Sequence, residues 1–383
     1  MFDCRKLLQD YFRATEPEAV AQRKARCLKR RQFYCAGNND IWRFGLWLHI
    51  VLEPHAGLIL WLKIWWTNRN PRLIASYYLE AARKKQGIPL VTQSDLGSEN
   101  YGVANCHTEL RQYLDPSLAG TLQHHWMRKN FNVKPEIAWG LLCRTWIPGF
   151  EDILDEGHLN GLYDPNNPLE KLVFLWLAIP WLQAELDAYV ELWNNTAPRA
   201  DKNKILPHGI PNHISEEPWE YDALDFKVNI VDPEIFDEAE RKWAPPDAPC
   251  FQCVPPEFDD HAHQLYDELG RPQISSDSFW DVYTDLLEMF RLQPEIPDYS
   301  SAPQSQAYSE EDNIELLPGM QALRLGKRAV GNNRWCYAGG LENPPLPSAL
   351  QSELAQDDSD NLTDHEENDA RYYVQFSDDE PVE

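Results

Sequence analysis

The segment between Leu58 and Ser94 contains an apolar run, then a stretch long enough for a helix, and then a second short apolar run. Asn70 and Pro71 mark the start of the middle segment, because proline is common in the first turn of a helix. Gly87 marks its end. This order predicts a strand, a crossover helix and a second strand parallel to the first. Ligand sites gather at the carboxyl ends of such strands. The second strand therefore places Asp95 where a functional side chain is expected.

The remaining elements are predicted from apolar spacing and turn residues. Two apolar runs at 44–52 and 58–66 are joined by a turn sequence, which predicts a hairpin. Further predicted elements are helices at 70–86, 101–114, 135–143, 169–193 with a kink at Pro180, and 278–291, and a short strand at 121–126.

A second acid, Glu136, lies on the first turn of a predicted helix, immediately after Pro135. Carboxylate oxygens brought together from separate elements are the ligands that Mg²⁺ prefers. Two such ions could activate an attacking oxygen and stabilise a leaving oxygen at a phosphodiester. Asp95 and Glu136 are the candidate ligands. A carboxylate is also favoured at a helix start by the local dipole, so a structural role for Glu136 remains an alternative.

Charge is divided unevenly along the chain. Residues 1–215 carry a net charge of +3 and residues 216–383 a net charge of -29. Because a negative field repels phosphate backbones, we expect nucleic-acid contacts to come from the first half. A basic cluster at 23–31, which includes Arg30 and Arg31, is typical of a phosphate-binding arm or a nuclear-import signal, with a solvated helix face as the plainer alternative.

Cellular location is constrained by what the sequence lacks. The eight cysteines are scattered along the chain, which is typical of reduced thiols in the cytosol or nucleus. No apolar run reaches membrane-spanning length, and the first residues do not resemble a secretion signal. We therefore expect a nuclear or cytoplasmic protein without membrane association.

Two further groups contain residues that can bind metals. One holds four zinc-type ligands in a spacing that matches no standard finger, so loop residues are the plainer interpretation: Cys250, Cys253, His261 and His263. The other, His124 and His125 beside Trp126, is predicted to be a strand-edge or core pair.

The segments Ser-Asp-Leu-Gly-Ser-Glu-Asn (94–100) and Asn-Val-Lys-Pro-Glu-Ile-Ala-Trp (132–139) resemble the second and third acidic motifs of the retroviral-type integrase catalytic core, in its transposon-derived branch. The similarity extends from about Pro17 to about Asn212. It implies an α/β fold, an RNase H-like mixed sheet flanked by helices, with an acidic, partly disordered C-terminal extension. It also implies DNA integration by strand transfer that depends on Mg²⁺ or Mn²⁺.

The resemblance assigns roles to individual residues. Asp95 and Glu136 would be catalytic metal ligands, while Asn132 and Lys134, together with Arg30 and Arg31, would orient the DNA. Within the second motif, Gly97 permits a tight turn and Asn100 is expected to cap the next helix.

One part of the family pattern is missing. In the family, the tryptophan matched by Trp42 is followed by the first catalytic aspartate, whereas here Trp42 continues directly into Arg43 and Phe44. Glu53 aligns with a different family acid and is a candidate substitute. Because the mechanism needs both metals in place, we expect weak or absent catalysis. An error in the gene sequence across this gap would produce the same pattern.

These observations predict four regions: a basic N-terminal arm (1–39), an integrase-like catalytic core (40–212), an acidic Pro-rich extension with some helix (213–293) and an acidic disordered tail (294–383). Within the tail, Ile314, Leu316 and Leu317 are a candidate interaction segment. The expected partners are DNA, further copies of the chain, and basic proteins bound by the tail. The alternative is a non-catalytic DNA- or protein-binding scaffold derived from an integrase.

Overall fold

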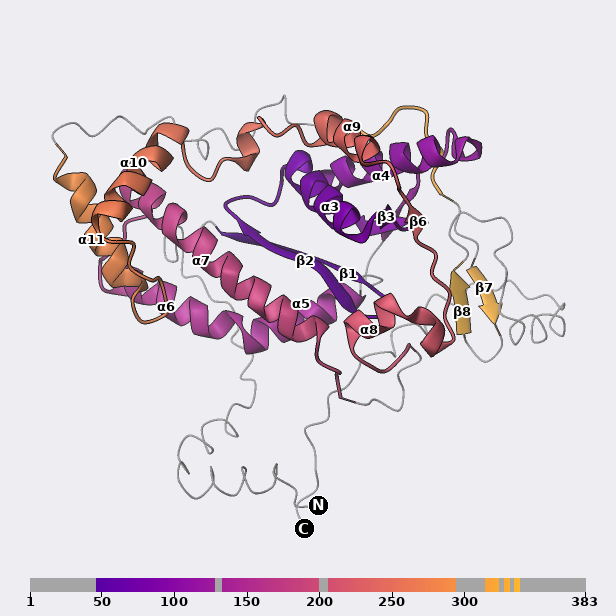
Figure 1. Ribbon diagram of the computed structural model, residues 1–383, viewed down its shortest axis with the longest axis horizontal. Helices are drawn as coiled ribbons and strands as arrows, with labels where there is room; N and C mark the ends of the chain where they lie inside the picture. Colours follow the sequence, from indigo (N-terminus) through magenta and orange to yellow (C-terminus); the bar gives the residue numbers. More distant parts are fainter. Residues whose placement is uncertain are drawn as a thin grey trace, which may run out of the picture. The chain divides into compact units, whose positions relative to one another are not determined.

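The computed structural model describes residues 46–127, 133–199, 206–293, 314–323, 327–330 and 334–337 (Figure 1). Several predicted functional residues lie outside this part of the chain: Arg30, Arg31 and Asn132 entirely, and Lys134 and Glu136 as far as their side chains are concerned. The described residues all belong to one compact unit, Leu46–Glu383.

The first two strands, β1 (Trp47–Glu53) and β2 (Leu58–Trp65), form the predicted antiparallel hairpin. The turn between them is held by Glu53, whose carboxylate accepts hydrogen bonds from the backbone N–H groups of His55 at 2.9 Å and Ala56 at 2.6 Å. Gly57 completes the turn with φ of 75°, a conformation that favours glycine.

Next come α3 (Pro71–Lys85), β3 (Gly87–Ile88), β4 (Thr92–Asp95), α4 (Tyr101–Leu114) and β5 (His124–Met127). The Asn70 side chain caps α3 by accepting from Arg72 N, and Gln86 ends it in the left-handed conformation. Strand β4 pairs in parallel with β5, so α4 is the crossover helix.

The expected single mixed sheet is not present among the described residues, whose strands form four separate pairs: β1–β2, β4–β5, β3–β6 (β6, Val228–Asn229) and β7–β8 (Lys327–Val330 and Arg334–Tyr337). The predicted parallel pairing of the two strands that flank the 70–86 helix is therefore wrong, since β2 and β4 belong to separate two-stranded sheets. The physical reason lies on β2, where side chains bond the edge that β1 leaves open. Gln183 bonds Ile64 N and Leu62 O, and Asn194 bonds both backbone groups of Ile59.

Both amides belong to the long helix α7 (Pro168–Asn194), which contains Pro180 and contacts β2 (Figure 1). It follows α5 (Val133–Thr145) and α6 (Ile147–Leu159). Asn167 caps α7 by accepting from two backbone N–H groups. Among the described residues, no helix is long and apolar enough to span a membrane.

The predicted extension is built into the same fold through α8 (Pro211–Glu216), α9 (Pro233–Trp243), α10 (Pro256–Glu268) and α11 (Phe279–Arg291). Phe236 and Trp243 of α9 share a hydrophobic core with Tyr78 of α3. Phe279 of α11 stacks on Trp181 of α7. Helices α9 and α11 of the predicted extension therefore share core packing with α3 and α7.

Part of the predicted disordered tail, residues 314–323, also packs against the core. The Asn105 side chain on α4 donates to Glu315 O at 2.7 Å and accepts from Leu317 N at 3.0 Å. Ile314 and Leu317 pack against the hydrophobic core that α3, α4 and α9 share. The candidate interaction segment thus contacts its own chain.

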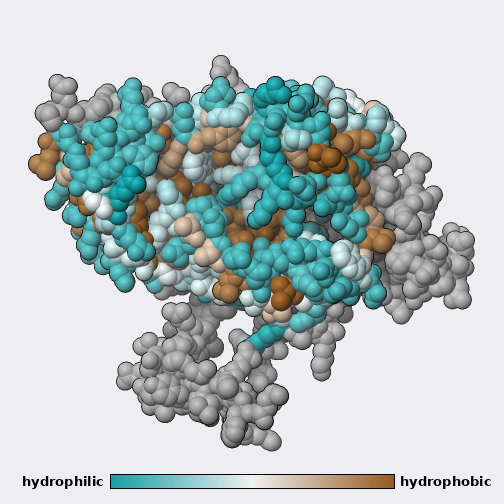
Figure 2. Space-filling view, in the orientation of Figure 1, coloured by the Kyte–Doolittle hydropathy of each residue, from teal (hydrophilic) through white to brown (hydrophobic). Residues whose placement is uncertain are grey.

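On the face drawn in Figure 2, hydrophilic residues cover much of the described surface and hydrophobic residues occur in patches between them. The large exposed hydrophobic side chains include Leu159, Val231 and Leu292, which come from separate parts of the sequence. Single exposed hydrophobic residues are normal on protein surfaces, so we base no site on them.

Candidate functional site

Asp95 is the last residue of β4, and its register partner Met127 is the last residue of β5. Both parallel strands therefore end at the same edge, as the sequence predicts for this acid. Asp95 is exposed, and its backbone carbonyl accepts from Gly97 N at 3.0 Å and from Asn100 Nδ2 at 3.4 Å. These bonds fold the chain sharply after the strand and leave Asp95 at the surface.

The turn after Asp95 continues through η1 (Ser98–Asn100). Gly97 has φ of -137°, which other residues can adopt, and a Cβ there would meet only the Glu99 carboxylate, the far end of a side chain that can rotate away. Asn100 occupies the N-cap position of α4 but makes no side-chain capping bond, which corrects the predicted role. Its amide instead donates to Asp95 O and to Glu99 Oε1. Asn100 therefore ties the turn to the end of β4.

His124 holds the two strands together beneath this turn. It is buried, with Nδ1 2.8 Å from Thr92 Oγ1 and Nε2 3.0 Å from Ser94 Oγ. Burial lowers the pKa of His124 to about 3, so the ring is neutral at physiological pH. Trp126, on the same strand, contacts the Tyr101 ring edge-on. This supports the structural interpretation of the histidine pair.

Glu136 lies near the start of α5, which begins at Val133, as the sequence predicts. Helix α5 contacts β1. The side chains of Glu136 and Lys134 lie outside the described part, as does Asn132. That Asp95 and Glu136 share a metal ion therefore stays a prediction.

Glu53 does not lie at the Asp95 position. The turn that follows Glu53 packs through Ala56 against Ile214, and Ser215, the next residue, accepts from Lys85 Nζ at 3.3 Å at the end of α3. By contrast, the chain after Asp95 reaches the start of α3, where a Cβ at Gly102 would overlap the Pro71 carbonyl. A helix of 15 residues is about 22 Å long. Glu53 and Asp95 are therefore near opposite ends of α3.

Residues 31–213 match the model of a family described as the integrase core domain. The chain contains an integrase core domain. No curated protein and no solved structure matches the chain. The family indicates a DNA-related function of the integrase or transposase kind, and its core domains generally depend on divalent metals. The matched region includes Asp95, the start of α5 and the basic residue Arg31.

The four residues that the sequence suggests as zinc ligands, which include Cys253 and His263, are not grouped around one point. The Cys253 thiol points towards α7, where it lies 3.6 Å from Leu175 O, and His263 pairs with Asp259 on the exposed side of α10. Cys250 is buried. Among the described residues, the side chains that lie close enough together to hold a metal ion are on α8 and the turn that follows it.

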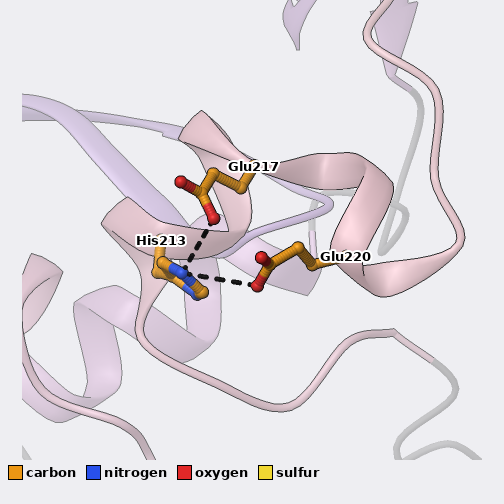
Figure 3. Close-up of side chains that lie close together, drawn as sticks. All are labelled: His213, Glu217 and Glu220. Atoms are coloured by element: carbon orange, nitrogen blue, oxygen red, sulfur yellow. Dashed lines mark ion pairs between the residues drawn. The ribbon is translucent and has the colours of Figure 1, made fainter.

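That group consists of His213, Glu217 and Glu220, whose ligand atoms all lie within 4.8 Å of one another (Figure 3). His213 Nε2 is 3.2 Å from Glu217 Oε2 and 3.6 Å from Glu220 Oε2. His213 is also the last residue of the matched integrase core domain. Sequence reasoning missed the group, although its spacing of four and then three residues is one that places side chains on one face of a helix.

Proposed function

We propose that this integrase core domain binds DNA and that Asp95 and Glu136 hold Mg²⁺ or Mn²⁺ for an impaired strand-transfer reaction. The observation that supports this is the family match over residues 31–213, combined with the exposed Asp95 at the carboxyl end of the parallel β4–β5 pair. Carboxylate oxygens from separate elements suit these hard cations.

Each residue has a distinct role in the proposal. The bound divalent ions supply Lewis-acid stabilisation of the attacking and leaving oxygens. Asp95 and Glu136 hold them, while Asn132 and Lys134 orient the phosphate being attacked. Arg30 and Arg31 contact the DNA backbone outside the site, where positive charge supplies affinity without sequence preference.

Impairment follows from the missing first acid. A two-metal displacement loses alignment when one ligand set is absent. Glu53, the candidate substitute, uses both carboxylate oxygens to hold the hairpin turn and lies near the far end of α3. We therefore expect the protein to bind DNA readily and to cleave or join it weakly or not at all.

The second candidate function is a non-catalytic scaffold, favoured by the same missing acid. In this case the core binds DNA or protein, and the negatively charged residues beyond 216 recruit basic partners. Self-association of the chain is compatible with both functions.

The experiment uses purified full-length protein, labelled DNA and either Mg²⁺ or Mn²⁺. Metal-dependent nicking that is lost in Asp95→Ala, but kept in the exposed control Asp152→Ala, supports the impaired enzyme. DNA binding without nicking supports the scaffold. Nicking that persists unchanged in Asp95→Ala overturns the assignment of Asp95, and absence of DNA binding overturns the DNA-binding function.

Nuclear residence is part of the proposal and has its own test. A fluorescently tagged chain should accumulate in the nucleus, and replacing Arg30 and Arg31 with alanine should shift it towards the cytoplasm if the basic cluster is the import signal. An unchanged distribution would assign the cluster to another role.

A further inference from the structure

We propose that His213, Glu217 and Glu220 form a zinc site, separate from the one at Asp95. It lies where the integrase core match ends, on α8 and the following turn η4 (Pro218–Tyr221). The inference does not depend on DNA binding or strand transfer.

The distances between the ligand atoms fit a tetrahedral ion. With bonds of about 2.1 Å, neighbouring ligand atoms around tetrahedral zinc are about 3.4 Å apart. The two separations from His213 Nε2, 3.2 Å to Glu217 and 3.6 Å to Glu220, lie on either side of this value. All three ligand atoms lie within 4.8 Å of one another, so small side-chain rotations suffice to converge on one ion.

Tyr221 fixes the orientation of the imidazole ring. Its hydroxyl is 2.9 Å from His213 Nδ1. When Nδ1 carries the proton and donates it to this hydroxyl, Nε2 presents its lone pair to the space between the carboxylates. Outer partners of this kind set the tautomer of histidine ligands in known metal sites. Gly209 leaves room for the hydroxyl, since a Cβ there would lie 2.7 Å from it.

The backbone that carries the ligands is anchored. Ile214, next to His213, is fully buried against Ala56 and Leu58 of the hairpin. Asn212 bonds Asn195 at 2.9 Å, and Ser215 accepts from Lys85 Nζ at 3.3 Å. The ligand set therefore starts from a fixed position on the hairpin.

The donor set selects zinc over magnesium. An imidazole nitrogen suits zinc and other first-row transition metals, whereas Mg²⁺ prefers oxygen ligands in octahedral geometry and keeps several waters. One nitrogen and two carboxylates leave a fourth tetrahedral position for water. Zinc would thereby link the end of the integrase core to the chain that follows it.

The test is isothermal titration of the metal-free full chain with Zn²⁺. Because the chain has other side chains that can bind zinc, including the exposed Cys143 thiol, the decisive quantity is the difference between wild type and variants. We expect His213→Ala to lose one equivalent of zinc, and Glu217→Gln and Glu220→Gln to bind it at least 10-fold more weakly. Tyr221→Phe should weaken binding by about 10-fold, as expected for an outer partner.

The control is His263→Ala. His263 also pairs with an acid four residues away, Asp259 at 3.6 Å, but the described part of the chain places no third ligand beside them. It should bind zinc like wild type, and Mg²⁺ should produce no comparable heat at the His213 site. Circular dichroism identifies any variant that fails to fold. The same stoichiometry in His213→Ala and wild type, with both folded, would show an ion-paired histidine only and overturn the proposal.

Discussion

Asn194 on α7 bonds both backbone groups of Ile59 on β2: Ile59 N donates to Asn194 Oδ1 at 2.9 Å, and Asn194 Nδ2 donates to Ile59 O at 2.9 Å. A neighbouring strand would make the same pair of bonds. Gln183, three turns earlier on α7, does the same for Ile64 N and Leu62 O. The helix thus takes the place of a strand at this edge.

Replacing Asn194 with alanine should lower the free energy of unfolding by about 2–4 kcal/mol, because it leaves two buried backbone groups without partners. Urea unfolding measures the change. Glu185→Ala, at an exposed position of the same helix, should cost no more than about 0.5 kcal/mol. Equal effects of the two substitutions would show that the Ile59 bonds contribute little.

Two glycines on α6 should respond oppositely to alanine. A Cβ at Gly157 would overlap the Trp280 ring, so Gly157→Ala should destabilise the fold by about 1–3 kcal/mol. A Cβ at Gly149 has no atom within 4 Å. Gly149→Ala should therefore leave stability unchanged or raise it by up to about 1 kcal/mol through helix propensity. Thermal unfolding compares them, and the same sign for both would contradict the packing argument.

His107 should make stability depend on pH. It is buried, with Nδ1 2.8 Å from the Tyr78 hydroxyl, and burial lowers its pKa to about 3 from an ordinary value of 6.5. Between these values the unfolded chain binds a proton that the folded chain does not. The free energy of unfolding should therefore fall by about 1.4 kcal/mol per pH unit for this residue as pH drops below 6.5. His49 and His124, whose pKa values burial also lowers, to about 4 and about 3, add to the slope.

Urea unfolding at pH 7, 6 and 5 tests this. His107→Gln should be less stable at pH 7 but lose stability less steeply towards pH 5. Asn194→Ala serves as the control, because it also destabilises the protein while keeping all titrating groups. An unchanged slope in His107→Gln would mean that the buried ring does not contribute.

Asn105→Ala should release residues 314–323 from α4. It removes the bonds to Glu315 O and Leu317 N. Limited proteolysis should then cleave this segment faster than in wild type, since local opening governs such cleavage. Asn166→Ala, whose exposed side chain bonds Asp164, is the control. Equal cleavage of both variants would show that Asn105 does not retain the segment.

Local signals in the sequence were sufficient for most helices. The 101–114 prediction coincides with α4, and the predicted 278–291 helix differs from α11 by one residue. Strand pairing could not be predicted in the same way, because it depends on partners far along the chain. The edge of β2 is bonded by Gln183 and Asn194, more than a hundred positions away, and nothing in β2 itself indicates this.

The candidate site was predicted in part. Asp95 was placed correctly at a strand end, because a short apolar run followed by Gly97 is a local signal. The His213 group was missed because Pro218 interrupts its spacing and suggests a break where the chain continues into another turn of 3₁₀-helix. The packing of the extension against α3 could not be predicted, because the apolar residues that make it, such as Phe236 and Trp243, are far apart in an acidic sequence.

The bonds from Asn105 to residues 315 and 317 also have a consequence for biosynthesis. The segment that covers α4 leaves the ribosome more than two hundred residues after the helix itself. A nascent chain must therefore keep that hydrophobic side of α4 exposed, or protected by a chaperone, until residues 314–317 have been synthesised. Messages truncated between the codons for α4 and Ile314 should consequently yield polypeptides that depend on chaperones to remain soluble.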